Sequence, residues 1–227
     1  MITTVVFDLD DTLYDEIEYC KSGFAAVAEF LADRLDGTDS EQTYNILWRQ
    51  FISGNRTKTF NAALDELKIS YDDNIINDMV GIYRNHKPDI KLPPDSRKVL
   101  CLLSKKYTLG LLTDGFLPAQ KLKVQALDIE KYFKSIIYTE EFGRDFWKPS
   151  SVGFTKIMDN LDSRPENTVY IADNEKKDFI APNQLGILTI QLIRPARIRR
   201  FADRGSDVSA REIIDQISRL PALLEEF

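Results

Sequence analysis

The sequence predicts an α/β protein built on a parallel sheet, with a block of α-helices inserted after the first strand. Residues 3–7 are β-branched and aromatic, which is typical of a buried strand, and four segments with apolar residues at helical spacing follow them. From residue 107 to residue 192, strand patterns then alternate with helix patterns, as in βαβ units. The opening strand must join this parallel sheet, because its backbone groups would otherwise have no partners.

The elements are expected in a definite order. Turn signals such as Asp36-Gly37 separate the four inserted helices, which are expected at residues 16–36, 41–53, 58–69 and 73–86. The later strands are expected at residues 107–112, 135–138, 168–172 and 187–192. Helices are expected before, between and after them, at residues 94–106, 118–127, 150–161, 176–185 and 209–227.

Prolines mark the return from the inserted helices to the sheet. Lys87-Pro88 and Leu92-Pro93-Pro94 interrupt the helical pattern. We therefore expect a core domain made of residues 1–14 and 90–227, and a four-helix domain made of residues 15–89. An insertion at this point lies over the carboxyl edge of the sheet, where open α/β sheets bind ligands.

Bulk properties exclude several classes of protein. No apolar run in the 227 residues approaches the ~20 residues that a membrane span needs, and the net charge of −6 disfavours nucleic acid as a partner. No leader precedes the first strand, so we expect a cytoplasmic protein, as a monomer or a small homo-oligomer. Cys20 and Cys101 are expected to form no disulfide. The single histidine, His86, argues against a histidine-based triad or zinc site.

Two acids follow the first strand. Asp8 and Asp10 lie just past its carboxyl end, with side chains expected on one face. Two carboxylates so placed repel each other, and three arrangements relieve the repulsion: a hard cation between them, a proton on one of them, or full solvation. The pair by itself does not choose among these.

Further polar landmarks fall where later strands end. Thr113 is followed by Asp114 and Gly115, a sequence that forms an ordinary turn and also presents a hydroxyl and backbone N–H groups to an anion. Lys148 precedes a proline that suits the start of a helix, so its cation points toward the strand ends. Asp173 ends another strand and Asp178 is expected on the helix after it, where capping alone would explain both acids.

Taken in order, these landmarks resemble the four motifs of the haloacid dehalogenase superfamily, and the resemblance covers nearly the whole chain. Its Asp-x-Asp-x-Thr motif corresponds to Asp8, Asp10 and Thr12, and its hydroxyl motif to Thr113. Its lysine corresponds to Lys148, and its terminal acids to Asp173 and Asp178. The resemblance implies a Rossmann-like core with an inserted α-helical cap of the first type. One departure is Ala172, where the family often has glycine before the first terminal acid.

The resemblance also implies a mechanism that uses Mg²⁺. Asp8 is the expected nucleophile, which forms an aspartyl-phosphate that water hydrolyses. The expected metal ligands are the carboxylates of Asp8 and Asp173 and the backbone carbonyl of Asp10. Asp178 is expected to support Asp173 or a metal-bound water without binding the metal directly. Thr113 and Lys148 are expected to bind the phosphate oxygens. Backbone groups near the reacting phosphate are expected to assist at three positions: Leu9, Asp114 and Gly115.

Asp10 is expected to act as general acid and base, which demands a shifted pKa. A free aspartate, with a pKa near ~3.9, has lost its proton at neutral pH. Burial and the neighbouring Asp8 raise this pKa, whereas a metal ion lowers it. The family's dehalogenases need no proton donor at this position, so Asp10 favours phosphoryl transfer.

We therefore expect a phosphatase that acts on a small phosphorylated metabolite, either a sugar phosphate or a nucleoside monophosphate. A phosphomutase of the same fold is the alternative, and a retired binding or regulatory module is less favoured because every reactive position is filled. In the helical insertion, Arg56 is a candidate substrate contact. A basic run at residues 194–204 holds five arginines. It could bind a polyanion or a partner, but a solvated connector is the favoured interpretation.

Overall fold

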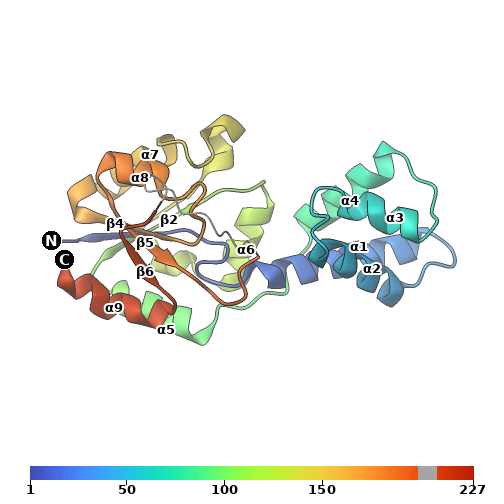
Figure 1. Ribbon diagram of the computed structural model, residues 1–227, viewed down its shortest axis with the longest axis horizontal. Coiled ribbons are helices and arrows are strands. Elements are labelled where there is room, and N and C mark those ends of the chain that lie inside the picture. Colours follow the sequence, from blue (N-terminus) through green and yellow to red (C-terminus); the bar gives the residue numbers. More distant parts are fainter. Residues whose placement is uncertain (199–208) are drawn as a thin grey trace. The chain divides into compact units, whose positions relative to one another are not determined.

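The computed structural model describes residues 1–198 and 209–227 and contains a six-stranded, wholly parallel sheet (Figure 1). The strand order is β3-β2-β1-β4-β5-β6, so the first strand lies inside the sheet. The strands are β1 (Thr4–Phe7), β2 (Thr108–Thr113), β3 (Ser135–Tyr138), β4 (Thr168–Ala172), β5 (Leu188–Leu192) and β6 (Glu212–Ile214). The predicted parallel α/β fold is confirmed.

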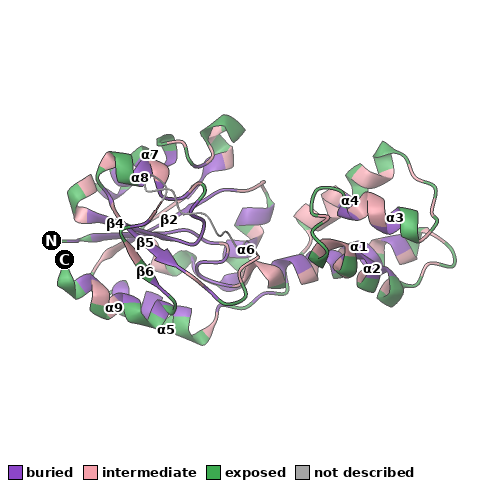
Figure 2. Cartoon of the chain, in the orientation of Figure 1, coloured by how far each residue is buried: buried purple, intermediate pink, exposed green. Residues whose placement is uncertain are grey.

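The register of the central strands brings their carboxyl ends to one level. Phe7 at the end of β1 pairs with Leu111 of β2 on one side and with Ile171 of β4 on the other. The residues that follow these partners therefore emerge side by side at one edge of the sheet. All four residues of β1 are buried, as expected for an interior strand covered on both faces (Figure 2).

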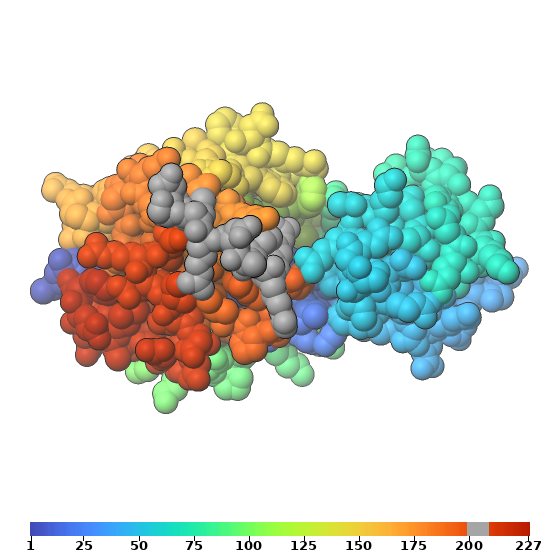
Figure 3. Space-filling view, in the orientation of Figure 1, coloured from blue at the N-terminus to red at the C-terminus, as the bar shows by residue number. Residues whose placement is uncertain are grey.

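Helices flank the sheet and supply its two hydrophobic layers. On one side, Phe154 and Ile157 of α7 pack with Val6 and Leu112 of the strands. On the other side, α5 lies beside the C-terminal elements, which are drawn in red next to green α5 in Figure 3. The helices of this part are α5 (Pro94–Leu103), α6 (Ala119–Leu127), α7 (Val152–Leu161), α8 (Ile180–Leu185) and α9 (Leu220–Leu223). Short 3₁₀ turns are η1 (Glu130–Tyr132), η2 (Thr139–Phe142), η3 (Arg144–Phe146), η4 (Pro165–Asn167), η6 (Ile217–Arg219) and η7 (Leu224–Glu226).

The chain divides into two compact units, one of residues 1–17 and 91–227 and one of residues 18–90. The second unit consists of α1 (Glu16–Arg34), which begins in the first unit, with α2 (Ser40–Ile52), α3 (Thr59–Glu66) and α4 (Asp73–Asn85). Its interior is aromatic, since Phe24 packs against Phe51, Phe60 and Tyr83. The sequence predicted domain breaks at 14/15 and 89/90, whereas the units divide at 17/18 and 90/91.

The C-terminal tail differs from its prediction. A closing helix interrupted near Pro221 was predicted over residues 209–227, but residues 212–214 form β6 at the edge of the sheet, and only short helical turns follow. Ile214 is buried while Ile213 is exposed, which is strand alternation. The prediction was wrong because three residues are too few for that alternation to be recognised.

Two further expectations can be compared with the described residues. No disulfide joins Cys20, which is buried, to Cys101, which is exposed. Throughout residues 1–198 and 209–227, every helix is too short or too polar to span a lipid bilayer.

Gly110 of β2 leads to a prediction about stability. A Cβ atom at this position would lie 2.8 Å from the terminal methyl groups of Ile157 and Leu161 on α7. Gly110→Ala is therefore expected to lower the free energy of unfolding by about 2 kcal/mol, measured by urea unfolding, because α7 must shift.

The control for this change is Gly81→Ala in α4, where an added Cβ meets nothing within 4 Å. Alanine is expected to stabilise this helix by about 0.5 to 1 kcal/mol. A Gly110→Ala protein as stable as the wild type would show that α7 yields without cost.

Candidate active site

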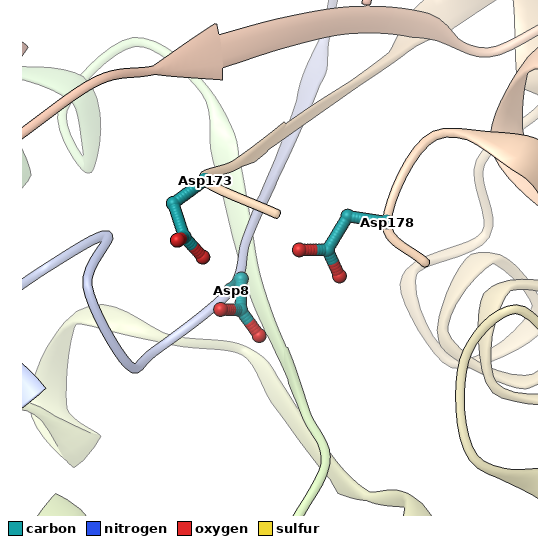
Figure 4. Close-up of side chains that lie close together, drawn as sticks. All are labelled: Asp8, Asp173 and Asp178. Atoms are coloured by element: carbon teal, nitrogen blue, oxygen red, sulfur yellow. The ribbon is translucent and has the colours of Figure 1, made fainter. Parts of the chain in front are cut away.

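Three aspartates converge at the carboxyl edge of the sheet (Figure 4). Asp8 directly follows β1 and Asp173 directly follows β4, while Asp178 lies in the turn before α8 rather than on the predicted helix. All three are buried, and each offers an oxygen within 4.8 Å of those of the other two. The register of β1 with β4 thus creates a compact oxygen cluster.

Lys148 binds two of these carboxylates. Its Nζ lies 2.6 Å from Asp8 Oδ1 and 2.8 Å from Asp178 Oδ1, and it donates to the hydroxyl of Tyr170 at 2.9 Å. Burial opposes the charge of this side chain, but Asp178 and Asp8 outweigh that effect and raise the pKa of Lys148 well above its ordinary value. The lysine is therefore a permanent cation beside the oxygen cluster.

One lysine leaves the cluster with excess negative charge. Burial, followed by repulsion from Asp178, raises the pKa of Asp8 to about 7, although Lys148 acts in the opposite direction. Burial, then Asp178 and Asp8, raise the pKa of Asp173 to about 9. Crowded carboxylates that resist ionisation are the donor set that a hard divalent cation stabilises. The residues therefore fit Mg²⁺.

Asp178 differs from the other two acids in how its oxygens are engaged. Its Oδ1 accepts from Lys148 and, at 3.3 Å, from the Tyr170 hydroxyl. Its Oδ2 accepts from the backbone N–H of Asn174 at 3.0 Å. Both oxygens of Asp178 already accept hydrogen bonds from the protein, which suits an acid that orients the groups around a metal rather than binding the metal itself.

Asp10 is held by a different set of donors. Its carboxylate accepts from Lys123 Nζ at 2.8 and 2.9 Å, from Gln120 Nε2 at 2.9 Å and from the hydroxyl of Tyr14. Burial would raise the pKa of Asp10, but Lys123 and the hydrogen bonds outweigh it and lower this pKa. Burial, Asp8 and a metal ion were the influences on this pKa expected from the sequence, and the contacts with Lys123 and Gln120 were not predicted.

The side chain of Asp114, in the loop after β2, joins this loop to three other segments of the site. Its carboxylate accepts from Thr139 Oγ1 at 2.8 Å, from the backbone N–H of Lys148 at 3.2 Å and from Lys177 Nζ at 2.8 Å. Burial opposes ionisation, but Lys148 and Lys177 lower the pKa of Asp114. Asp114 was predicted to offer its backbone to substrate. The three contacts of its side chain were not predicted from the sequence.

Thr113, the last residue of β2, and Gly115 lie on either side of Asp114 in the sequence. Thr113 is buried, and its Oγ1 accepts from Gln120 Nε2 at 2.7 Å. Gly115 has a φ of +142°, and a Cβ atom there would lie 2.8 Å from Cδ of Gln120. Glycine is therefore required both by the backbone conformation and by the close approach of this buried amide.

The turn after Asp10 is also tied to the core. Asp11, at a φ of 54°, accepts from the backbone N–H of Glu16 at 2.9 Å and from that of Ile198 at 2.8 Å. Burial raises the pKa of Asp11 to about 6. Thr12 is buried, and its Oγ1 has no hydrogen-bond partner among the residues described. These contacts hold the turn that carries the acids.

Two arginines of the basic run contradict the solvated connector that was expected. Arg194 is buried and contacts Asp15 at 2.7 Å and the carbonyl of Thr12 at 3.3 Å. The side chain of Arg197 is 9% exposed and donates to the carbonyl of Asp173 at 3.3 Å. Both therefore brace the loops of the site. The remaining arginines lie outside the described residues: Arg199, Arg200 and Arg204.

The structure locates two residues that were predicted to contact substrate, but it does not test that role. Leu9 is fully buried beside Asp8 in the sequence, and its carbonyl accepts from the backbone N–H of Leu13 at 2.9 Å. Arg56 belongs to the helical unit, where its guanidinium lies over the ring of Phe51. Substrate binding by either residue stays a prediction.

Comparison with known proteins identifies relatives over the full chain. Residues 5–192 match the family described as haloacid dehalogenase-like hydrolase. A glyceraldehyde 3-phosphate phosphatase from Methanocaldococcus jannaschii is 30% identical over 97% of this chain and 99% of its own. A ribulose-1,5-bisphosphate 5-phosphatase from Halopiger xanaduensis is 25% identical over 99% of this chain and 100% of its own.

Solved structures share the fold. A putative beta-phosphoglucomutase from Thermotoga maritima superimposes with a TM-score of 0.71 at 19% identity, covering 99% of each chain. A 2-haloacid dehalogenase from Pseudomonas syringae pv. Tomato gives a TM-score of 0.66 at 24% identity over 100% of this chain and 99% of its own. At these identities the likeness concerns the fold alone.

The raised pKa values of three buried aspartates lead to a prediction about how stability depends on pH. The pKa values of Asp11, Asp8 and Asp173 rise from 3.8 to about 6, 7 and 9, so between about pH 5 and 9 the folded state holds more protons than the unfolded state. With a chelator present, the free energy of unfolding is expected to fall as pH rises through this window, by at most about 1.4 kcal/mol per pH unit for each group.

Asp173→Asn provides the control, because it removes the group with the highest of these pKa values. Urea unfolding of this variant is expected to show a shallower fall above pH 7. A wild-type protein whose stability increases from pH 7 to 9 without metal would contradict the raised pKa of Asp173.

Proposed function

The chain belongs to the haloacid dehalogenase-like hydrolase family and is a phosphoric monoester hydrolase, and we propose that it removes phosphate from a short sugar phosphate through an aspartyl-phosphate on Asp8. The observation that carries this proposal is the position of Asp8. It is buried at the end of a central strand, with one oxygen 2.6 Å from Lys148. A nucleophile fixed beside a permanent cation suits attack on an anionic phosphorus centre.

The relatives support the substrate class. Proteins named glyceraldehyde 3-phosphate phosphatase, at 30% and 27% identity, align with almost the whole chain, including its helical unit. We therefore propose glyceraldehyde 3-phosphate, or a sugar phosphate of similar size, ahead of a nucleoside monophosphate. The helical unit of residues 18–90 would act as a cap of the first type that restricts substrate size.

Mg²⁺ would be held by the carboxylates of Asp8 and Asp173 and by the backbone carbonyl of Asp10. When bound, it would neutralise phosphate charge in this crowded set of acids. Asp178 would support these ligands, as its two engaged oxygens suggest. Lys148 and Thr113, with the backbone of Asp114, would bind the phosphate oxygens that do not react.

The reaction would proceed in two displacements. In the first, an oxygen of Asp8 bonds to phosphorus while the bond from phosphorus to the sugar oxygen breaks, and protonated Asp10 gives its proton to that oxygen. In the second, Asp10 accepts a proton from water, whose oxygen attacks phosphorus and releases phosphate from Asp8. The donors around Asp10 favour its ionised form, which suits the second displacement, and a bound phosphate dianion would raise its pKa for the first.

A cytoplasmic location stays a prediction.

Replacement of the nucleophile tests the proposed function. Asp8→Asn is expected to lower the release of phosphate from glyceraldehyde 3-phosphate by at least about 10³-fold, because the amide does not attack phosphorus. The assay should run with Mg²⁺ and with a chelator, across a panel of sugar phosphates and nucleoside monophosphates, and excess chelator is expected to abolish turnover.

Asp159→Asn, an exposed change on α7, is the matched control and should retain full activity. Mass analysis of the products separates hydrolysis from phosphomutase chemistry, since a mutase yields an isomeric phosphosugar instead of free phosphate. Full turnover by Asp8→Asn would remove Asp8 as the nucleophile.

A further inference from the structure

The buried face of α6 carries two polar side chains that no part of the proposed mechanism uses. Gln120 and Lys123 are three positions apart, so they project from the same side of the helix. We infer that both are positioning residues for catalysis, which hold Asp10 in line with the leaving oxygen and join it to the phosphate-binding Thr113. This inference rests on the proposed function, because it assigns Asp10 the acid–base role.

The burial of these two side chains is unusual. Gln120 is 1% exposed and the side chain of Lys123 is 5% exposed, on a helix face that otherwise presents Ala119, Val124 and Leu127. Lysine is almost never buried unless it is paired, because removal of its charge from water is costly. A leucine at either position would complete an ordinary apolar face. Both polar groups are directed instead at the loops of the site.

Lys123 fixes Asp10 in both position and rotation. Its Nζ contacts the two oxygens at 2.8 and 2.9 Å, while Tyr14 donates to Oδ1 and Gln120 to Oδ2. A carboxylate bound on both oxygens has no freedom to turn about its Cβ–Cγ bond. Asp10 lies outside the strand, where the backbone alone would leave its side chain several rotamers.

Gln120 joins this contact to the phosphate-binding loop. Its Nε2 lies 2.9 Å from Asp10 Oδ2, 2.7 Å from Thr113 Oγ1 and 2.7 Å from the carbonyl of Asp114. One amide nitrogen therefore spans the loops after β1 and β2, one of which carries the proton donor and the other a phosphate ligand. A shift of either loop changes the distance between the proton and the leaving oxygen.

Such alignment has a measurable kinetic effect. A displacement of about 1 Å at a reacting group costs on the order of 10²-fold in rate. The cost depends on the leaving group, since an alkoxide needs a proton to depart and a nitrophenolate leaves as a stable anion. A purely structural lesion would slow both kinds of substrate alike.

The test compares first-turnover rates, with enzyme in excess, for glyceraldehyde 3-phosphate and for 4-nitrophenyl phosphate. Lys123→Met is expected to slow the first substrate about 10²-fold and the second by less than about 3-fold. Gln120→Leu is expected to slow glyceraldehyde 3-phosphate about 10-fold and serves as the second variant if Lys123→Met does not fold. Lys121→Met, on the same helix, replaces an exposed lysine paired with Glu141 and should leave both rates unchanged.

Asp10→Asn, assayed in parallel, separates the two levels of the proposal. If Asp10→Asn does not slow glyceraldehyde 3-phosphate, the acid role in the proposed function fails. If it does, and folded Lys123→Met or Gln120→Leu matches the wild type on this substrate, the positioning inference is overturned. Equal slowing of both substrates by the α6 variants, with unchanged thermal unfolding, would also overturn it.

Discussion

The ion pairs of Lys148 are the interaction on which the rest of the site depends. Three buried carboxylates lie close to one another at the carboxyl edge of the sheet, and burial raises the pKa of Asp8 and that of Asp173. Lys148 lies 2.6 Å from Asp8 and 2.8 Å from Asp178, and its own burial is compensated by these partners. A buried ion pair of this kind adds little net stability, because desolvation offsets the attraction. Its value here is local, since Lys148 opposes the rise that burial causes in the pKa of Asp8 and holds one oxygen of that carboxylate in place.

The loops that carry the reactive groups are themselves braced by charge. The loop after β1 is held by Arg194 at the carbonyl of Thr12, the turn after β4 by Arg197 at the carbonyl of Asp173, and the segment before α7 by Asp114 at the backbone of Lys148. Each brace joins residues far apart in the sequence. The sheet sets the level at which the loops emerge, and these contacts set the direction in which their side chains point.

The fold and the main motifs could be predicted from the sequence because each motif is a short run at the end of a recognisable strand. Asp8 and Asp173 could be placed at one edge of the sheet because both follow parallel strands, and the family resemblance implied that they share a metal ion. Lys123 and Gln120 could not, since a lysine on an amphipathic helix is normally solvated; the only clue was two polar residues in line with Ala119 and Leu127. The basic run was interpreted wrongly in the opposite sense, because charge density predicts solvation. Arg194 is instead buried, the side chain of Arg197 is only 9% exposed, and both contact backbone carbonyls. β6 was missed because three residues carry too little periodicity.

Asp114 has a consequence for how such a protein can diverge. Its carboxylate serves Thr139, the backbone of Lys148 and Lys177, so three surface loops share one anchor. An insertion or deletion beside any of these contacts would disturb the other two loops at once, and a change at position 114 would require compensating changes in several places. Drift in loop length is therefore confined to segments that this anchor does not reach. The helical unit carries none of the three contacts, so changes in its sequence leave this anchor intact.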